Sequence, residues 1–222
     1  MDQFVNRREA GRLLALRLME YANRSDVIVL ALPRGGVPIG YEVALALGAP
    51  LDVFVVRKIG VPWNEEVAIG AVASGGIWTL DTPLIRKLQI SHSDLDRIIV
   101  KELRELERRE RVYRGMRPFP KLQGRVVIVV DDGLATGASM MAAVEAIRQQ
   151  SAGSSIVVAT PVASPEACLA VRRIADACIA LMIPDPLYSV GMYYTDFSQT
   201  TDDEVLTLLQ RAADQSTQTV AS

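Results

Sequence analysis

The chain has 222 residues, of which half are hydrophobic, and its 24 Lys and Arg against 26 Asp and Glu give a formal charge of −2. These values fit one globular α/β domain with appendages and argue against a dedicated nucleic-acid surface. No apolar stretch approaches the ~20 residues that span a bilayer, and charges interrupt the first apolar run, so we expect no signal peptide and no membrane partner. Two cysteines in apolar surroundings, Cys168 and Cys178, favour reduced thiols and a cytoplasmic protein.

The first predicted elements are a helix, a strand and a glycine-containing turn. Asn6 and Glu9 resemble a capping box for a helix over 7–21, and the apolar run 27–32 predicts a buried strand. A turn with one cation and two glycines follows: Pro33, Arg34, Gly35, Gly36. Glycine allows close approach of a ligand and a guanidinium matches two phosphate oxygens, so the turn suits pyrophosphate. The alternative is an ordinary turn whose arginine faces water.

The second predicted strand, 51–56, ends in two cations, Arg57 and Lys58. At the carboxyl end of a strand they would face the same crevice as the other ligand-binding loops. A solvated basic pair is the alternative.

Residues 64–123 depart from a minimal α/β core. The segments 68–73 and 77–80 predict a β-hairpin of the kind that forms a lid, and Ser91 with Asp94 predicts the start of a long helix. Its basic residues indicate a solvated face, with a dimer contact or an anionic-ligand surface as alternatives. His92 is the only histidine, so no histidine-dependent triad or two-histidine metal site can form.

The stretch VVIVVDDGLATGAS, residues 126–139, carries the most specific signal. Five apolar residues predict a strand buried on both faces, and two acids, Asp131 and Asp132, follow it directly. Carboxylates accept hydrogen bonds from vicinal hydroxyls, and the start of the next helix offers backbone N–H groups to a phosphate. The expected ligand contacts are Gly133, Leu134, Ala135, Thr136, Gly137, Ala138 and Ser139. Diol and phosphate together describe a ribose 5-phosphate; the alternative is a polar turn with two solvated acids.

The remaining chain completes the alternation of strands and helices. Strands are predicted at 156–160 and 177–183, with a helix capped by Ser164 between them. The alternation predicts a mostly parallel, doubly wound α/β sheet. The segment 184–199 is rich in aromatic residues that can stack on a planar base or pack internally; the candidates are Tyr188, Val190, Gly191 and Tyr193. Thr201 and Glu204 predict the cap of a terminal helix through Ala213.

The pattern of residues 126–139 resembles the motif of type I phosphoribosyltransferases that binds 5-phosphoribosyl 1-diphosphate (PRPP). RKIGVP, residues 57–62, is similar to a run in adenine phosphoribosyltransferases that leads into a mobile catalytic loop, and the resemblance covers about residues 27–197. It implies one domain over 1–214, with a lid and helical insertion at 58–125, a hood over the base at 184–200 and a flexible tail at 215–222.

The resemblance also implies an enzyme that uses PRPP and Mg²⁺ to transfer a 5-phosphoribosyl group to a nitrogenous base, releasing pyrophosphate. Asp131 and Asp132 would hold the ribose diol and the Mg²⁺, through water or substrate oxygens, while Arg34, Arg57 and Lys58 neutralise the pyrophosphate. Ala135 stands where hypoxanthine-type members carry a third acid, so either a general base comes from elsewhere, with Glu65 or Glu66 as the candidates, or the nucleophile needs none. The family's habit of pairing implies a homodimer.

Two other functions remain open from the sequence. One is a regulatory module that senses PRPP or a nucleotide without turnover, and the other is a hydrolase of a phosphoribosyl compound.

Overall fold

The structure, a computed structural model, describes residues 3–220 apart from the side chains of residues 65, 66 and 216–220. Its centre is a five-stranded sheet in the order β2-β1-β6-β7-β8, in which all neighbours are parallel. The strands are β1 (Val27–Ala31), β2 (Leu51–Val53), β6 (Val126–Val130), β7 (Ser155–Val162) and β8 (Ala177–Met182). The predicted α/β class with a mostly parallel sheet is confirmed.

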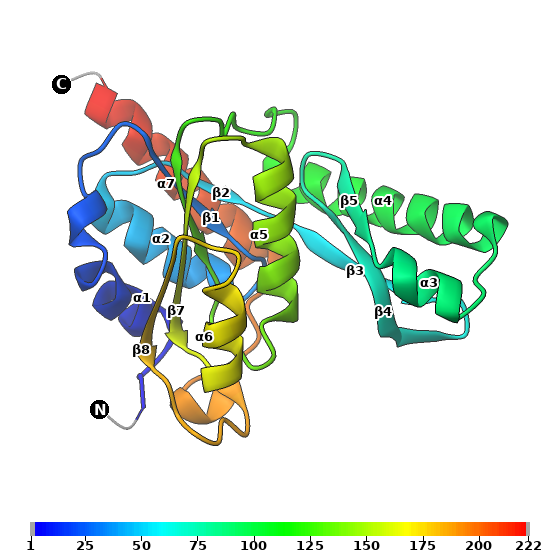
Figure 1. The fold of residues 1–222 in the computed structure, drawn as a ribbon. Helices are drawn as coiled ribbons and strands as arrows, with labels where there is room; N and C mark the ends of the chain where they lie inside the picture. Colours follow the sequence, from blue (N-terminus) through cyan, green and yellow to red (C-terminus); the bar gives the residue numbers. More distant parts are fainter. Residues whose placement is uncertain (1–2, 221–222) are drawn as a thin grey trace.

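Helices cover both faces of this sheet (Figure 1). One face packs against α1 (Arg7–Leu16), α2 (Gly36–Leu47) and α7 (Asp202–Val220), and the other packs against α5 (Ala138–Gln150) and α6 (Pro165–Val171). Because β1 and β6 are apolar on both faces, all ten of their residues are buried between the two helical layers. Ligand loops can therefore form only at the ends of the strands.

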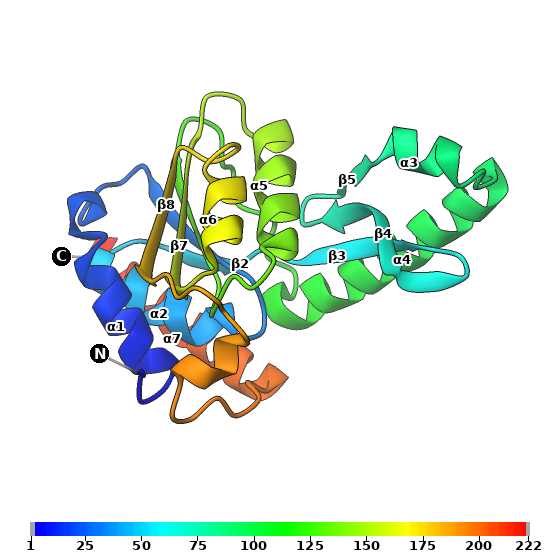
Figure 2. The ribbon, with the colours of Figure 1, turned by 60° about the horizontal axis from the view of Figure 1, so that its bottom comes forward.

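A second sheet projects from the first as an arm (Figure 2). It is antiparallel and has three strands, β3 (Val56–Val61), β4 (Asn64–Ala73) and β5 (Ile77–Leu80), followed by α3 (Thr82–Lys87) and α4 (His92–Arg114). The predicted hairpin and long helix are confirmed. Two elements of the arm were not predicted: the strand β3 and the short helix α3. Asp81 caps α3 by accepting a hydrogen bond from the Leu84 amide at 2.9 Å.

The predicted single strand over 51–56 is wrong. The chain leaves the central sheet after Val53 and enters the arm at Val56, and between them the Val55 amide donates to Ser74 Oγ at 2.9 Å. Apart from Asp52 the run is apolar because both sheets bury it, so hydrophobicity alone does not show the break. As a result, Arg57 and Lys58 lie inside β3 rather than beyond the end of a strand.

Helix ends follow the predicted caps more closely than the predicted lengths. Asn6, Ser91, Ser164 and Thr201 each accept a hydrogen bond from the amide three residues on, at 3.0–3.1 Å. The first helix ends at Leu16, however, and a short 3-10 turn at Met19–Tyr21 replaces its predicted last part. The terminal helix continues to Val220 instead of ending at Ala213. Residues 215–220 of the predicted flexible tail therefore belong to this helix. Residues 221 and 222 of that tail lie outside the described residues.

The arm is fixed to the central sheet by a buried arginine near the end of α4. Arg114 is 6% exposed; its Nη2 donates to the Val53 carbonyl at 2.9 Å, and it forms ion pairs with Asp52 and Glu110. A buried guanidinium with this many partners fixes the direction in which α4 leaves the core.

Candidate functional site

The two predicted ligand loops meet at the carboxyl end of β6. A Cβ atom added to Gly35 would lie 2.0 Å from Asp132 Oδ2, and one added to Gly36 would lie 2.6 Å from the Val130 carbonyl oxygen. Only glycine fits at either position, so the loop after β1 packs directly on the acid pair. The Pro33–Arg34 peptide bond in this loop is cis.

The acid pair concentrates negative charge in little space. Burial, followed by the neighbouring charge of Asp132, raises the pKa of Asp131 well above its ordinary value. Burial also raises the pKa of Asp132, although Arg7 opposes this shift. Carboxylates that resist ionisation in this way are stabilised by a cation or by hydroxyl donors, as a metal ion or a sugar diol would supply.

Arg7 is the partner of the acid pair that the sequence did not reveal. Its Nε and Nη2 atoms both lie 2.9 Å from Asp132 Oδ2, and its Nη1 donates to the Ser198 carbonyl at 2.7 Å. The guanidinium carbon lies 3.9 Å from the centre of the Phe197 ring. Arg7 therefore joins the first turn of α1, the acid pair and the C-terminal loop. The available signal was a cation at the first residue of a helix, where the helix dipole disfavours positive charge.

The loop that follows the acids forms a cradle at the start of α5. Leu134 anchors it: its side chain is 2% exposed and its amide donates to the Val162 carbonyl at 2.9 Å, so only its backbone can reach a ligand. Gly137 adopts a left-handed conformation, φ 72°, immediately before the helix begins at Ala138. The side chains of Ala135, Thr136 and Ser139 are exposed around this helix start. The predicted cradle thus has exposed hydroxyls beside helix-start amides, the combination that binds phosphate.

Residues 184–200, the segment predicted to cover the base, contact the loop after the acid pair through Val190. A Cβ atom added to Gly133 would lie 2.3 Å from Val190 Cγ1, so the two residues are in direct contact. Gly191 packs on Phe197, and the hydroxyl of Tyr194 donates to the Asp132 carbonyl at 2.6 Å. Tyr188 is 81% exposed, which leaves its ring uncovered by the rest of the described chain. Val190 and Tyr194 therefore bring part of the segment 184–200 against Asp132 and the loop that follows it.

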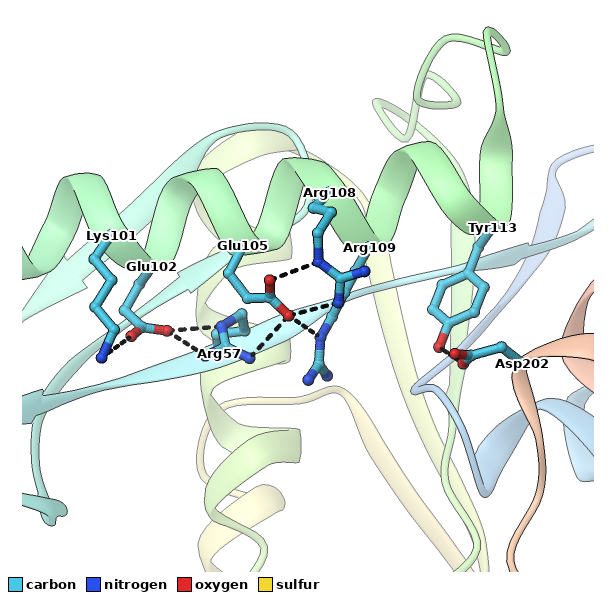
Figure 3. Close-up of polar contacts among 8 residues, drawn as sticks. All are labelled: Arg57, Lys101, Glu102, Glu105, Arg108, Arg109, Tyr113 and Asp202. Carbon is cyan, nitrogen blue, oxygen red and sulfur yellow. Dashed lines mark hydrogen bonds and ion pairs between the residues drawn. The ribbon is translucent and has the colours of Figure 1, made fainter.

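The predicted basic residues occupy different surroundings. Arg34 precedes Gly35 in the chain, and its side chain points toward α7, where Nη1 lies 3.9 Å from Asp202 Oδ1. Arg57 instead turns toward α4, where its Nε donates to Glu102 at 2.7 Å, as Figure 3 shows. Lys58 is exposed on β3. The structure thus gives Arg34 and Arg57 acidic partners other than the acid pair: Asp202 for Arg34 and Glu102 on the arm for Arg57. The side chains of Glu65 and Glu66 lie outside the described residues.

The two carboxylates of the site suit a metal ion that takes most of its ligands from water and substrate. Within residues 3–220, and leaving aside the undescribed side chains, no group of three or more His, Cys, Asp or Glu can hold a metal. Asp131 and Asp132 offer two carboxylates at a polar strand end. Mg²⁺ fits such a pair, since it retains waters and binds through one or two carboxylates plus substrate phosphates.

The structure also bears on the predictions for the two cysteines and for membrane-spanning segments. Cys168 and Cys178 are both buried and free, with their sulfur atoms 3.7 Å apart. Over the described part of the chain, every helix is too short or too polar to cross a membrane.

A parallel sheet that is covered by helices on both faces and carries an acid pair at one strand end defines a doubly wound α/β domain, and comparison with known families identifies it. The model of the phosphoribosyl transferase domain matches residues 3–191, and the chain belongs to this family. The family that residues 126–139 resemble is thus confirmed.

Relatives match nearly the whole length of this chain. The crystal structure of TT1426 from Thermus thermophilus is 42% identical and superposes with a TM-score of 0.83, covering 94% of this chain and 98% of that one. Two proteins of Mycobacterium tuberculosis, from strains CDC 1551 and H37Rv, are provisionally named phosphoribosyl transferases and are 42% identical over 213 residues. The match covers 96% of this chain and 47% of theirs, so the chain spans about half the length of these relatives.

Proposed function

We propose that the protein is a phosphoribosyltransferase that uses PRPP and Mg²⁺ to transfer a 5-phosphoribosyl group to a nitrogenous base. The observation that carries the proposal is the contact of Gly35 and Gly36 with the acid pair, beside the start of α5. It supports the proposal because the turn proposed for pyrophosphate, the carboxylates proposed for the diol and the loop proposed for the 5-phosphate then surround one point.

In the proposed reaction, a nitrogen of the base forms a bond to C1 of the ribose while the bond from C1 to the diphosphate oxygen breaks. Pyrophosphate leaves with the electron pair, positive charge develops on the sugar ring, and the proton of the attacking nitrogen passes to water or to the departing pyrophosphate. Asp131 and Asp132 hold the diol and stabilise this charge, while Arg34 faces the leaving group. Each electrostatic contact of this kind lowers the activation barrier by about 3 kcal/mol.

Asp131 and Asp132 would also hold Mg²⁺, through water or substrate oxygens, and the ion would supply neutralisation of the diphosphate charge. Arg7 would assist, because its pair with Asp132 opposes the rise that burial causes in the pKa of that carboxyl group and also orients it. Residues 184–200 supply the surface for the base. Arg57 and Lys58 on β3, as further contacts of the leaving group, stay predictions.

The test is release of pyrophosphate from PRPP and Mg²⁺ in the presence and absence of a panel of purine and pyrimidine bases. We expect release that depends on one base, with formation of the matching nucleotide. Release without any base would indicate a hydrolase, and binding of PRPP without release would indicate a sensor. Either result would overturn the transferase proposal.

Replacement of both Asp131 and Asp132 by Asn should abolish turnover while circular dichroism shows a folded protein, because the two acids lie at the end of β6 rather than in the core. Persistent turnover in this variant would remove the acids from the reaction. The expected homodimer is checked separately by sedimentation, and the cytoplasmic location by fractionation.

A further inference from the structure

A small cavity lies where the loop after β1, helix α4 and the start of α7 come together. It has a volume of about 150 Å³, and its lining includes Arg34 from the loop, Arg108, Arg109 and Tyr113 from α4, and Asp202 from α7. The sequence alone indicates a solvated face for the α4 arginines, yet the fold turns two of them toward Arg34. Such a volume has room for several water-sized atoms, so a tetrahedral phosphate group fits.

The lining carries excess positive charge. Three guanidinium groups face one carboxylate, that of Asp202, and the Arg34–Asp202 separation of 3.9 Å is too long for a hydrogen bond. The carboxylate already accepts a hydrogen bond from the Tyr113 hydroxyl at 2.6 Å. Arg34 therefore retains the capacity to donate to an anion.

The α4 arginines are held in place from outside the cavity (Figure 3). Glu105 accepts from Arg108 Nε at 2.7 Å and Nη2 at 2.9 Å, and from Arg109 Nε at 3.0 Å. A single carboxylate thus positions both guanidinium groups, which lowers the entropy that an incoming anion must remove. Planar guanidinium groups fixed in this way suit the oxygens of a phosphate.

Arg34 of the cavity lining is the neighbour in sequence of Gly35, which packs on the acid pair. Arg34 precedes Gly35, whose backbone packs on Asp132, so the loop links the two places directly. A diphosphate whose first phosphate lies at Gly35 and Gly36 would extend its second phosphate along Arg34. This relationship connects the arm, through α4, to the site on the central sheet.

We propose that Arg108 and Arg109 join Arg34 in binding the terminal phosphate of a diphosphate held at the acid pair. The proposal rests on the proposed function and deepens it, since it makes α4 of the arm part of the substrate site. It also assigns selectivity: the cavity favours a diphosphate over a monophosphate. Ribose 5-phosphate, which lacks the diphosphate, does not use it.

The test is calorimetric titration of the full chain with inorganic pyrophosphate and Mg²⁺. Arg108→Ala and Arg109→Ala should each weaken pyrophosphate binding by roughly tenfold or more, because each removes a charge-assisted contact. The same variants should bind ribose 5-phosphate as the wild type does. Arg104→Ala is the matched control, since Arg104 is an exposed arginine on the same helix that does not line the cavity.

Asp202→Asn tests for a gain, rather than a loss, of pyrophosphate affinity. It removes the one carboxylate of the lining and keeps an oxygen that can accept from Tyr113, so pyrophosphate should bind several-fold more tightly. A variant that only disturbed the fold would not gain affinity. Unchanged pyrophosphate affinity in Arg108→Ala, Arg109→Ala and Asp202→Asn would overturn the proposal.

The two proposals fail in distinguishable ways. If the protein shows no base-dependent turnover of PRPP but pyrophosphate affinity falls in Arg109→Ala and rises in Asp202→Asn, the diphosphate site stands and the transferase proposal falls. If turnover is present and the arginine variants bind pyrophosphate as tightly as Arg104→Ala, the role of α4 falls alone.

Discussion

Arg7 Nε and Nη2 both lie 2.9 Å from the same oxygen of Asp132, Oδ2, although the two residues are 125 positions apart in the chain. The side chains are only 11% and 17% exposed, so water screens the pair little. The ion pair connects the N-terminal helix to the acid pair that defines the site. It also offsets the unfavourable position of a cation at the start of α1.

Replacement of Arg7 by Met should destabilise the protein, because it leaves Asp132 partly buried without its cation. We expect the free energy of unfolding at pH 7 to fall by about 3 kcal/mol, measured by urea denaturation. The matched control is Arg8→Met, which breaks a pair with Glu42 in which the arginine is 48% exposed and should cost less than about 1 kcal/mol. Equal losses in the two variants would contradict a special role for Arg7.

Asp131→Asn should stabilise the unliganded protein at neutral pH. The folded state raises the pKa of Asp131 above its unfolded value, so the folded state binds the proton more tightly and wild-type stability falls as pH rises through this interval. The variant lacks this loss. Its advantage in the free energy of unfolding should therefore be absent below about pH 4, grow above it, and reach about 1.4 kcal/mol for each unit by which the pKa is raised.

Asp176→Asn is the control of opposite sign for this pH series. Burial opposes the change, but hydrogen bonds from the Ile156 amide and Arg148 lower the pKa of Asp176 in the folded protein. Its contribution to stability is present above the unfolded pKa and is lost as pH falls. Asp176→Asn should thus be less stable than wild type at pH 7, with the difference closing below about pH 4. A pH-independent effect in Asp131→Asn would contradict the assigned cause.

The parts of the site that depend on local sequence were predictable. The apolar run of β6, the two acids and the glycines before α5 are contiguous, so their arrangement follows from one strand, one turn and one helix start. The expectation that the strand-end loops face one crevice agrees with the packing of Gly35 on Asp132, since the parallel neighbours β1 and β6 bring their carboxyl ends to one edge. The contact itself was not predicted.

The parts that depend on contacts distant in sequence were not predictable. Arg7 reaches Asp132 only because α1 packs beside β7 and β8, and no local pattern specifies that docking. The break between β2 and β3 was hidden because both sheets bury the same apolar run, and it moved Arg57 from the expected crevice to Glu102 on α4. Sequence patterns fix elements more reliably than they fix which sheet an element joins.

Arg114→Met should release the arm from the central sheet. The variant leaves Asp52 and Glu110 without their shared cation and the Val53 carbonyl without its donor, so we expect a loss of about 3–5 kcal/mol in the free energy of unfolding. Hydrogen exchange should accelerate most in β3, β4 and β5. Arg97→Met, at a 77% exposed position on the same helix, should cost less than about 0.5 kcal/mol. Similar exchange rates in the two variants would remove Arg114 as the anchor.

Gly133→Ala should displace the hood from the acid pair. The new Cβ would lie 2.3 Å from Val190 Cγ1 and 2.5 Å from Cγ2, closer than any real contact, so the segment that carries Val190 must move. Because this segment is the proposed surface for the base, we expect KM for the base to rise at least tenfold, while the affinity for pyrophosphate changes little. Steady-state kinetics and pyrophosphate titration measure the two effects.

The control for this prediction is the double variant Gly133→Ala/Val190→Ala. Shortening Val190 removes both γ carbons and leaves only its Cβ, 2.9 Å from the added methyl group, so a small shift suffices to relieve the overlap. The double variant should recover part of the lost affinity for the base even though Val190→Ala alone removes packing. If Val190→Ala worsens the effect of Gly133→Ala, the overlap is not the cause, and the loss must arise within the loop that follows Asp132.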